Sequence, residues 1–232
     1  VKDKKSLLSI TFSPNGKFIA IGSENGEVLL LQFNERELRE YTKISFGNPV
    51  KRLIFSSDSK FLIVATDTTV AYPSARISLL SLEQKKIVYT SGLLDSPPSV
   101  QGLAIKPNSN LIARTGGAPG ISLWQIEDNR LIYKQELSTK ILWGISMDAS
   151  FSSDGDFFAS GTREFVQIWR MSDKMLLCEW AAHKRRGPIA MDTVKFSRIS
   201  PDGSFLITGA LKDNTIKIWN IEKIKHLKNI SK

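Results

Sequence analysis

The sequence predicts an all-β protein built from five repeats of one antiparallel unit. Two observations support this fold class. Short apolar or alternating runs recur along the whole chain, which is typical of buried and half-buried strands. The same pattern of apolar run, turn and apolar run also returns five times, at positions 12, 55, 105, 151 and 199, with intervals of 43 to 50 residues. Almost no helix is expected.

The fifth repeat shows the pattern most completely. The turn at Pro201-Asp202-Gly203 precedes a short apolar run, Phe205 to Thr208, that fits a buried strand. A second turn at Asp213-Asn214 then leads into an alternating strand. Ile216 and Ile218 share one face of that strand, because successive side chains point to opposite sides.

Each repeat divides into expected strands in chain order. They are 7–12, 17–22, 27–33 and 38–44; then 50–55, 60–66, 77–82 and 86–90; then 100–105, 110–115, 121–126 and 131–137; then 145–151, 156–161, 166–171 and 175–181; and finally 191–196, 204–210 and 215–221. In the fifth repeat, a bulge or longer turn is expected after 196. The last segment, 224–230, fits either a fourth strand or a short helix.

This organisation resembles the WD-repeat family, in which each repeat forms one four-stranded blade of a β-propeller. Trp219-Asn220 stands where the family has its Trp-Asp pair, and Trp124 and Trp169 hold the same third-strand place in repeats three and four. Leu31 and Leu80 occupy it in repeats one and two. The resemblance implies one β-propeller over 1–232, with repeats at approximately 1–46, 47–95, 96–141, 142–187 and 188–232.

The family usually has seven blades and closes its ring with an N-terminal strand. Five repeats are visible here, and no segment is left over for that closure. We therefore favour a chain that forms part of a larger, about seven-bladed ring. A five-bladed ring closed in another way is the alternative. In the first case, the apolar flanks of the first and last blades are expected to be exposed.

In this family, the third-strand Trp often joins a hydrogen-bonded set with a Ser or Thr, an Asp and a His. Repeat five matches the set with Trp219, Thr208, Asp213 and His183. Such a buried network would tie a loop to its blade, so His183 is expected to be structural. Repeat four keeps Ser160 and Trp169 but has Arg163 where the Asp would fall, so one blade is expected to carry the set.

Propellers of this family commonly serve as rigid platforms for protein partners. The loops from fourth to first strands and from second to third strands would lie on one face. That face would carry an insertion in repeat two, 67–76, and a basic loop, 184–186. Aromatic and Arg side chains are frequent interface anchors. The candidate partner-binding residues are Tyr72, Arg76, Trp143, Arg163, Lys184, Arg185 and Arg186.

The net charge of +9 leaves a second class of partner open. The lysines are scattered along the chain, which favours an ordinary solvated surface and a protein partner, with an acidic one suited to the basic loop. A related propeller group that binds phosphoinositides has a Phe-Arg-Arg-Gly run at a comparable place, where this chain has Lys184 in place of Phe. Phosphoinositide, anionic-membrane or nucleic-acid binding through 184–186 is therefore the alternative.

The sequence contains no recognisable motif for catalysis, a metal or a cofactor. Asp58, Asp154 and Asp202 recur at turns, where an Asp caps its own backbone. The one cysteine, Cys178, falls in an expected outer strand, and His226 lies in the tail. We expect no enzymatic activity, no metal and no cofactor. The single cysteine favours a cytoplasmic location, and the lack of an apolar run of about 20 residues predicts no transmembrane segment. The family resemblance implies that further domains are attached to this chain.

Overall fold

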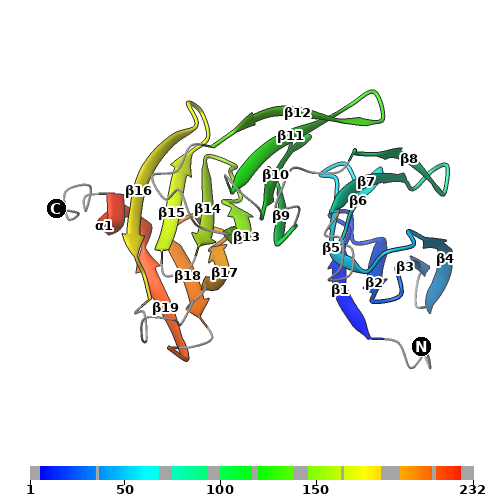
Figure 1. Cartoon of the computed structure of the whole chain (residues 1–232), viewed down its shortest axis with the longest axis horizontal. Coiled ribbons are helices and arrows are strands. Elements are labelled where there is room, and N and C mark those ends of the chain that lie inside the picture. The colour runs from blue at the N-terminus through cyan, green and yellow to red at the C-terminus, as the bar shows by residue number, and fades with distance from the viewer. Residues whose placement is uncertain are drawn as a thin grey trace. The chain divides into compact units, whose positions relative to one another are not determined.

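The structure is a computed structural model that describes residues 6–34, 37–67, 75–92, 100–116, 120–137, 146–162, 165–183, 194–210 and 213–225. Within these residues it contains strands β1 to β19 and a single short helix, α1 (Ile221–Lys225) (Figure 1). The strands form five antiparallel sheets, and each sheet takes its strands in chain order. The prediction of an all-β fold with five repeated sheets is confirmed. We number these sheets blades 1 to 5.

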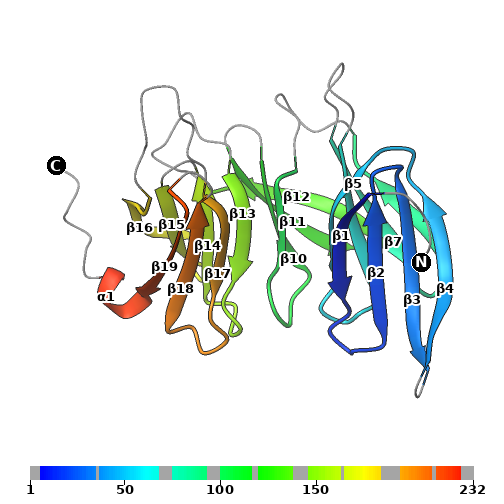
Figure 2. The ribbon, with the colours of Figure 1, turned by 90° about the horizontal axis from the view of Figure 1, so that it is seen from below.

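Blades 1 to 4 have four strands each, and the described part of blade 5 has three. Blade 1 contains β1 (Leu7–Phe12), β2 (Phe18–Ser23), β3 (Glu27–Asn34) and β4 (Glu37–Ser45), which Figure 2 shows side by side. Blade 2 contains β5 (Val50–Phe55), β6 (Phe61–Thr66), β7 (Arg76–Ser81) and β8 (Lys86–Thr90). Blade 3 contains β9 (Gly102–Ile105), β10 (Leu111–Thr115), β11 (Ile121–Glu127) and β12 (Arg130–Glu136).

The remaining two blades follow the same order. Blade 4 contains β13 (Ser146–Phe151), β14 (Phe157–Thr162), β15 (Phe165–Arg170) and β16 (Met175–Ala181). Blade 5 contains β17 (Val194–Ile199), β18 (Phe205–Ala210) and β19 (Thr215–Asn220). Contacts divide the chain into two compact units: residues 1–100, 109–111 and 124–133, and residues 101–108, 112–123 and 134–232. Blades 1 and 2 lie in the first unit, blades 4 and 5 lie in the second, and blade 3 has residues in both.

One hydrogen-bonded turn joins the first two strands in four blades. In blade 1, the Ser13 hydroxyl donates to Oδ1 of Asn15 at 2.7 Å, and the main-chain N–H of Lys17 donates to the same oxygen at 3.0 Å. The main-chain N–H of Phe18 donates back to the Ser13 hydroxyl at 2.8 Å. Gly16 follows with a φ of 69°, a left-handed conformation that glycine adopts without steric cost. This geometry explains why the turn motif is visible in the sequence.

The turn role expected for Asp58, Asp154 and Asp202 is confirmed. Their Oδ1 atoms accept from the hydroxyls of Ser56, Ser152 and Ser200 at 2.6, 2.5 and 2.5 Å, respectively. The hydrogen bonds from Ser152 and Ser200 hold the pKa values of Asp154 and Asp202 below the ordinary range. These carboxylates therefore act within their own turns.

In the first unit, blade 2 packs against one face of blade 1. A Cβ added to Gly22 in β2 would lie 2.4 Å from Cγ1 of Val50 in β5, so the two strands need a glycine at this point. Around that contact, buried apolar side chains of both blades form one cluster. Its members include Ala20, Val28 and Leu30 of blade 1 and Val50, Leu53 and Phe55 of blade 2.

In the second unit, blade 5 packs against blade 4 in the same way. A Cβ added to Gly161 in β14 would lie 2.5 Å from Cγ1 of Val194 in β17. The junction also has a polar contact, because Oδ2 of Asp148 accepts from the main-chain N–H of Ser197 at 2.9 Å and from the guanidinium of Arg198. Two junctions in separate parts of the chain thus share one glycine–valine contact.

The expected end of the first strand in repeat five is wrong. Phe196-Ser197 resembles the strand ends of repeats one, two and four, but β17 continues to Ile199. The irregularity lies earlier, between Val194 and Phe196, where the pairing register shifts. The same shift opens β1, β5 and β13. The shift is therefore shared by four of the five first strands and is not an extra turn of repeat five.

After β19, the chain forms a helix over the described part of the last segment. In α1, Oδ1 of Asn220 accepts from the main-chain N–H of Lys223 at 3.0 Å, which caps the helix start. Ile221 and Ile224 are buried. The helix begins three residues earlier than 224, and residues 226–230 of the expected strand or helix lie outside the described residues. Among the described residues, no helix has the length and apolar character that a membrane span requires.

Candidate functional site

Most side chains expected to bind a partner lie outside the described residues. These are Tyr72, Trp143, Arg163, Lys184, Arg185 and Arg186. Arg76 is described, and its side chain is exposed at the start of β7. Its Nη1 lies 3.5 Å from the main-chain oxygen of Ser91, which is long for a hydrogen bond. Arg76 thus places a positive charge at the exposed start of β7.

The strand pairing shows which edge of each blade carries the candidate loops. In blade 2, Val50 pairs with Thr66 and Thr66 pairs with Arg76, so β5 begins where β6 ends and β7 begins. The same pairing joins β17, β18 and β19 in blade 5. We call this the loop edge of a blade. Segments 67–76 and 184–193 both connect to the loop edge of their own blade.

Four side chains at the loop edge of blade 5 share one chain of hydrogen bonds. The indole Nε1–H of Trp219 donates to Oγ1 of Thr208 at 2.9 Å. Nε2 of His183 lies 2.9 Å from the same oxygen, and its Nδ1 lies 2.7 Å from Oδ2 of Asp213. His183, Thr208 and Asp213 are buried, and Trp219 is half-buried. The structure thus brings together the four residues that the repeat-five motif suggested.

The hydrogen-bond partners assign the protons in this network. The indole nitrogen can only donate, so Thr208 accepts from Trp219 and turns its own proton toward Nε2 of His183. Nδ1 then carries the ring proton and donates to the Asp213 carboxylate. With the ring proton on Nδ1, every member of the set has a hydrogen-bond partner. Both ring nitrogens of His183 are occupied, so the side chain holds the structure together.

Two family models match the chain. The model described as "WD domain, G-beta repeat" matches residues 177–220, which include the whole network. The "Anaphase-promoting complex subunit 4 WD40 domain" model matches residues 10–96, which include most of blades 1 and 2. Together they cover more than half of the chain. The chain belongs to the WD-repeat family.

Curated relatives of this WD-repeat chain are distant and longer. It is 26% identical over 120 residues to "Small ribosomal subunit protein RACK1" of Candida albicans, covering 51% of the chain and 36% of that protein. It is 27% identical over 133 residues to "Protein lethal(2)denticleless" of Drosophila melanogaster, covering 53% and 17%. It is 24% identical over 211 residues to human "Apoptotic protease-activating factor 1", covering 90% and 15%. The chain therefore spans about a third or less of these relatives.

The Asp213 carboxylate is held ionised within this WD-repeat network. Burial raises its pKa, but hydrogen bonds from His183 and Thr215 outweigh that effect and lower the pKa from 3.8 to about 2. The main-chain N–H of Thr215 donates to Oδ1 of Asp213 at 3.0 Å, and its hydroxyl lies 3.3 Å from Nδ1 of His183. The turn between β18 and β19 is thus tied to the residue that follows β16.

A second set of contacts holds the same stretch of chain. Nζ of Lys217 donates to the main-chain oxygen of Ala182 at 2.6 Å and lies 5.9 Å from the centre of the Trp219 ring. The rings of Trp180 and Trp219 meet edge to face, with centres 5.3 Å apart. Residues 180 to 183 are therefore fixed to β19 directly before the basic loop begins at Lys184.

No group of three or more His, Cys, Asp or Glu side chains that could hold a metal occurs among the residues that the structure describes. Cys178 is a half-buried free thiol in the outer strand β16, as its place in the sequence suggested. In repeat four, Ser160 donates to the main-chain oxygen of Asp148 at 3.0 Å, a contact within its own blade.

Sequence reasoning missed two residues that support the site. Thr215 follows Asp213 by two positions, and the Asp-x-Thr spacing is a recognisable turn motif that could have identified it. Asp148 joins blade 4 to blade 5 across 49 residues of sequence. Its local sequence gives no sign of this contact, because the partner comes from a different repeat.

Proposed function

We propose that this chain is a non-catalytic WD-repeat platform that binds a protein partner through the loop edge of its blades. The observation that carries the proposal is the network of blade 5, which fixes His183 directly before the basic run Lys184 to Arg186. At the other end of the segment, Val194 is buried against Gly161. A loop held at both ends loses less conformational freedom when it binds than a loop on a free tether.

Further candidates for the same surface come from blades 2 and 4. The insertion 67–76 carries Tyr72 and ends at the exposed Arg76. In the sequence, Trp143 precedes β13 and Arg163 follows β14, so the segments that carry them connect to the loop edge of blade 4. Aromatic and Arg side chains are the usual anchors of protein interfaces. The cations favour an acidic partner, because opposite charge accelerates encounter.

Partner capture from a cell lysate, quantified by mass spectrometry, tests this proposal. Tyr72→Ala and Arg185→Ala should each reduce recovery of the same partner by at least several-fold. Both variants should keep the far-UV circular dichroism spectrum of a β-strand protein. Lys17→Ala is the matched control, because Lys17 is an exposed cation in the turn at the opposite edge of blade 1. Equal recovery by all three variants would remove the loop edge from the binding surface.

A second candidate function is binding of a polyanion through the same loop. The run Lys184 to Arg186 and the net charge of +9 favour it, and one relative is named a small ribosomal subunit protein. Basic loops bind phosphates electrostatically, so such binding weakens steeply as salt is added. Retention on phosphatidylserine vesicles or single-stranded RNA that disappears between low and physiological salt would favour this candidate over a protein partner.

The proposal also includes the setting of the platform. The five blades belong to a longer array of about seven, within a cytoplasmic protein that carries further domains. The greater length of the relatives supports the larger protein, and the free thiol of Cys178 fits a reducing compartment. Sequencing the transcript on both sides of the region that encodes residues 1–232 tests this. Further repeats would support the longer array, and their absence would contradict it.

A further inference from the structure

Blade 1 contains two Asn-Gly pairs, Asn15-Gly16 and Asn25-Gly26. An Asn followed by glycine is prone to deamidation, because no side chain hinders the main-chain nitrogen of the glycine when it attacks the Asn side chain. Asn15 lies in the turn between β1 and β2, and Asn25 lies in the turn between β2 and β3. The structure shows that the two turns respond differently to this reaction.

The turn that holds Asn15 also accepts a carboxylate. Oδ1 of Asn15 accepts from the Ser13 hydroxyl at 2.7 Å and from the main-chain N–H of Lys17 at 3.0 Å. In blades 2, 4 and 5, Oδ1 of an Asp makes the same two bonds, to the Ser two residues before it and the N–H two residues after it. These residues are Asp58, Asp154 and Asp202. Because a charged acceptor strengthens a hydrogen bond, an aspartate at position 15 would suit the turn at least as well.

The main chain at Gly16 has room to move. Gly16 is exposed, and a Cβ added there would meet nothing within 4 Å. Its N–H donates to the main-chain oxygen of Ser13 at 2.9 Å, so attack on Asn15 requires only a local opening of this exposed turn. A preceding blade does not by itself close this place. Gly203, at the same place in blade 5, also meets nothing within 4 Å although blade 4 precedes it.

The main chain at Gly26 is held by the loop between β4 and β5. Gly26 is buried, and an added Cβ would lie 2.7 Å from the main-chain nitrogen of Asn48. Its N–H donates to the oxygen of Ser23 at 3.2 Å, and its oxygen accepts from the N–H of Phe46 at 2.7 Å. Attack on Asn25 would therefore have to displace this loop, so the fold protects Asn25.

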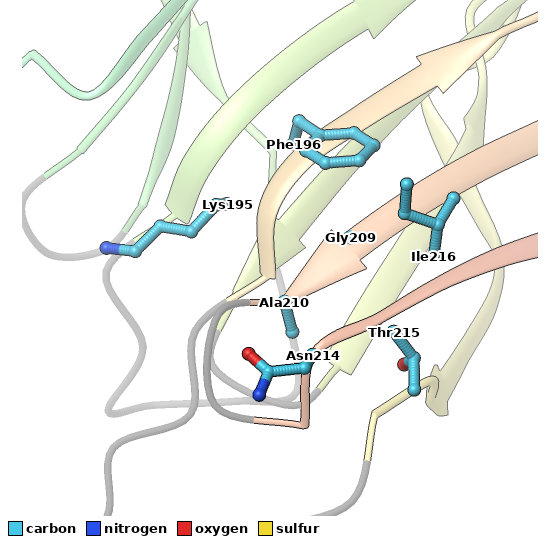
Figure 3. Close-up of a pocket in the computed structure, with 7 residues that line it drawn as sticks. All are labelled: Lys195, Phe196, Gly209, Ala210, Asn214, Thr215 and Ile216. Atoms are coloured by element: carbon cyan, nitrogen blue, oxygen red, sulfur yellow. The ribbon is translucent and has the colours of Figure 1, made fainter.

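A third exposed Asn shows why the residue that follows is important. Asn214 lies in the turn before β19, directly before Thr215 (Figure 3). Thr215 is β-branched, and its main-chain N–H donates to Oδ1 of the buried Asp213 at 3.0 Å. The nitrogen that would attack Asn214 is therefore both hindered and hydrogen-bonded to a carboxylate.

We propose that Asn15 is a site of spontaneous deamidation, which converts the turn of blade 1 to the aspartate form of blades 2, 4 and 5. The nitrogen of Gly16 forms a bond to Cγ of Asn15, and the Cγ–Nδ2 bond breaks. Nδ2 leaves as ammonia with the proton that the Gly16 nitrogen gives up. Water then opens the succinimide ring. Its attack at Cγ yields aspartate, and its attack at the main-chain carbonyl carbon yields isoaspartate.

The inference goes beyond the proposed function, because this turn lies at the edge opposite the loop edge. Aspartate at position 15 lowers the net charge of +9 by one unit and keeps the hydrogen bonds of Oδ1. Isoaspartate instead inserts Cβ into the main chain and leaves the carboxylate on Cα. That product should not reproduce the bonds of Oδ1, so it should lower the stability of blade 1.

Peptide mapping by mass spectrometry after incubation in mildly alkaline buffer tests the assignment. In the folded chain, Asn15 should lose its amide at least several-fold faster than Asn25 or Asn214. In denaturing urea, Asn15 and Asn25 should react at similar rates, because both precede glycine and neither turn is formed. The proposal is overturned by equal rates at these two residues in the folded chain, by faster reaction at Asn25, or by a folded chain whose Asn15 is intact when the denatured chain has reacted.

Two variants provide independent checks. Gly16→Ser introduces the residue that blade 2 has at this place, Ser59, which adopts a similar φ of 58°. It should slow the reaction at Asn15 and leave that at Asn25 unchanged. Asn15→Asp makes the aspartate product directly and should unfold at a urea concentration no lower than the wild type. Earlier unfolding of Asn15→Asp, or an unchanged rate in Gly16→Ser, would contradict the proposal.

Discussion

Nδ1 of His183 lies 2.7 Å from the carboxylate of Asp213. This contact joins the segment that follows β16 in the sequence to the turn that precedes β19. The two residues are 30 positions apart, and both are buried. Buried polar groups must be paired, because an unpaired one loses its hydrogen bonds to water without replacement. The pair therefore fixes the start of the basic loop to blade 5.

Replacing Asp213 with Ala should lower the free energy of unfolding by about 1–3 kcal/mol, because the buried Nδ1–H of His183 loses its carboxylate acceptor at 2.7 Å and keeps only the longer contact to the Thr215 hydroxyl at 3.3 Å. Urea titration followed by tryptophan fluorescence measures the loss. Asp156→Ala is the control, since Asp156 is exposed in the turn before β14 and should stay within about 0.5 kcal/mol of the wild type. Equal and negligible losses at both positions would show that the network contributes nothing.

Acid should remove the contribution that the ionised Asp213 carboxylate makes to the free energy of unfolding. The pKa of Asp213 is lowered from 3.8 to about 2, so the unfolded chain takes up a proton here at a higher pH than the folded chain. Its contribution is complete above about pH 4 and is lost as the pH falls toward about 2. The stability difference between the wild type and Asp213→Asn should therefore be constant above that range and shrink within it. Urea titrations at several pH values test this, and a difference that persists at pH 2 would contradict it.

Gly161 should tolerate no larger side chain at the junction of blades 4 and 5. Gly161→Ala would place a Cβ 2.5 Å from Val194, so it should destabilise the second unit by about 1–3 kcal/mol. Gly92→Ala is the matched control, since an added Cβ there meets nothing within 4 Å. Thermal unfolding of the double variant Gly161→Ala/Val194→Ala adds a check. Its loss should be smaller than the sum of the single losses, because removing the valine methyl groups relieves the clash.

The parts of this fold that the sequence predicts are those encoded over a few residues. The turn at Ser13 and Asn15 closes with hydrogen bonds between neighbours, so its motif can be read locally. The network of blade 5 was also predictable, because the family motif places its residues at fixed positions. In both cases, short-range chemistry and a repeated pattern agree with the final structure.

The features that the sequence could not predict depend on distant neighbours. The alternation of Ile216 and Ile218 indicates a common face, but their exposure depends on what lies against that face. The sequence did not predict that β17 extends to Ile199, because Phe196-Ser197 has the pattern that ends the first strand in other repeats. The strand continues past these residues because it pairs with β18. Most partner-binding candidates fall outside the described residues, so their role remains a prediction from the family pattern.

Partner affinity of an Asp213 variant tests the central claim most directly, because Asp213 is buried and acts on the basic loop through His183. The partner recovered with the wild type would be titrated against Asp213→Ala, Arg185→Ala and Asp156→Ala at a temperature where all remain folded. Ordering of a loop is worth about 0.5–1.5 kcal/mol per side chain, so Asp213→Ala should weaken binding by roughly three- to tenfold. Arg185→Ala should weaken it as well, and Asp156→Ala, in the exposed turn before β14, should leave it unchanged. Affinity that is unchanged in both Asp213→Ala and Arg185→Ala would contradict a platform that binds through this loop.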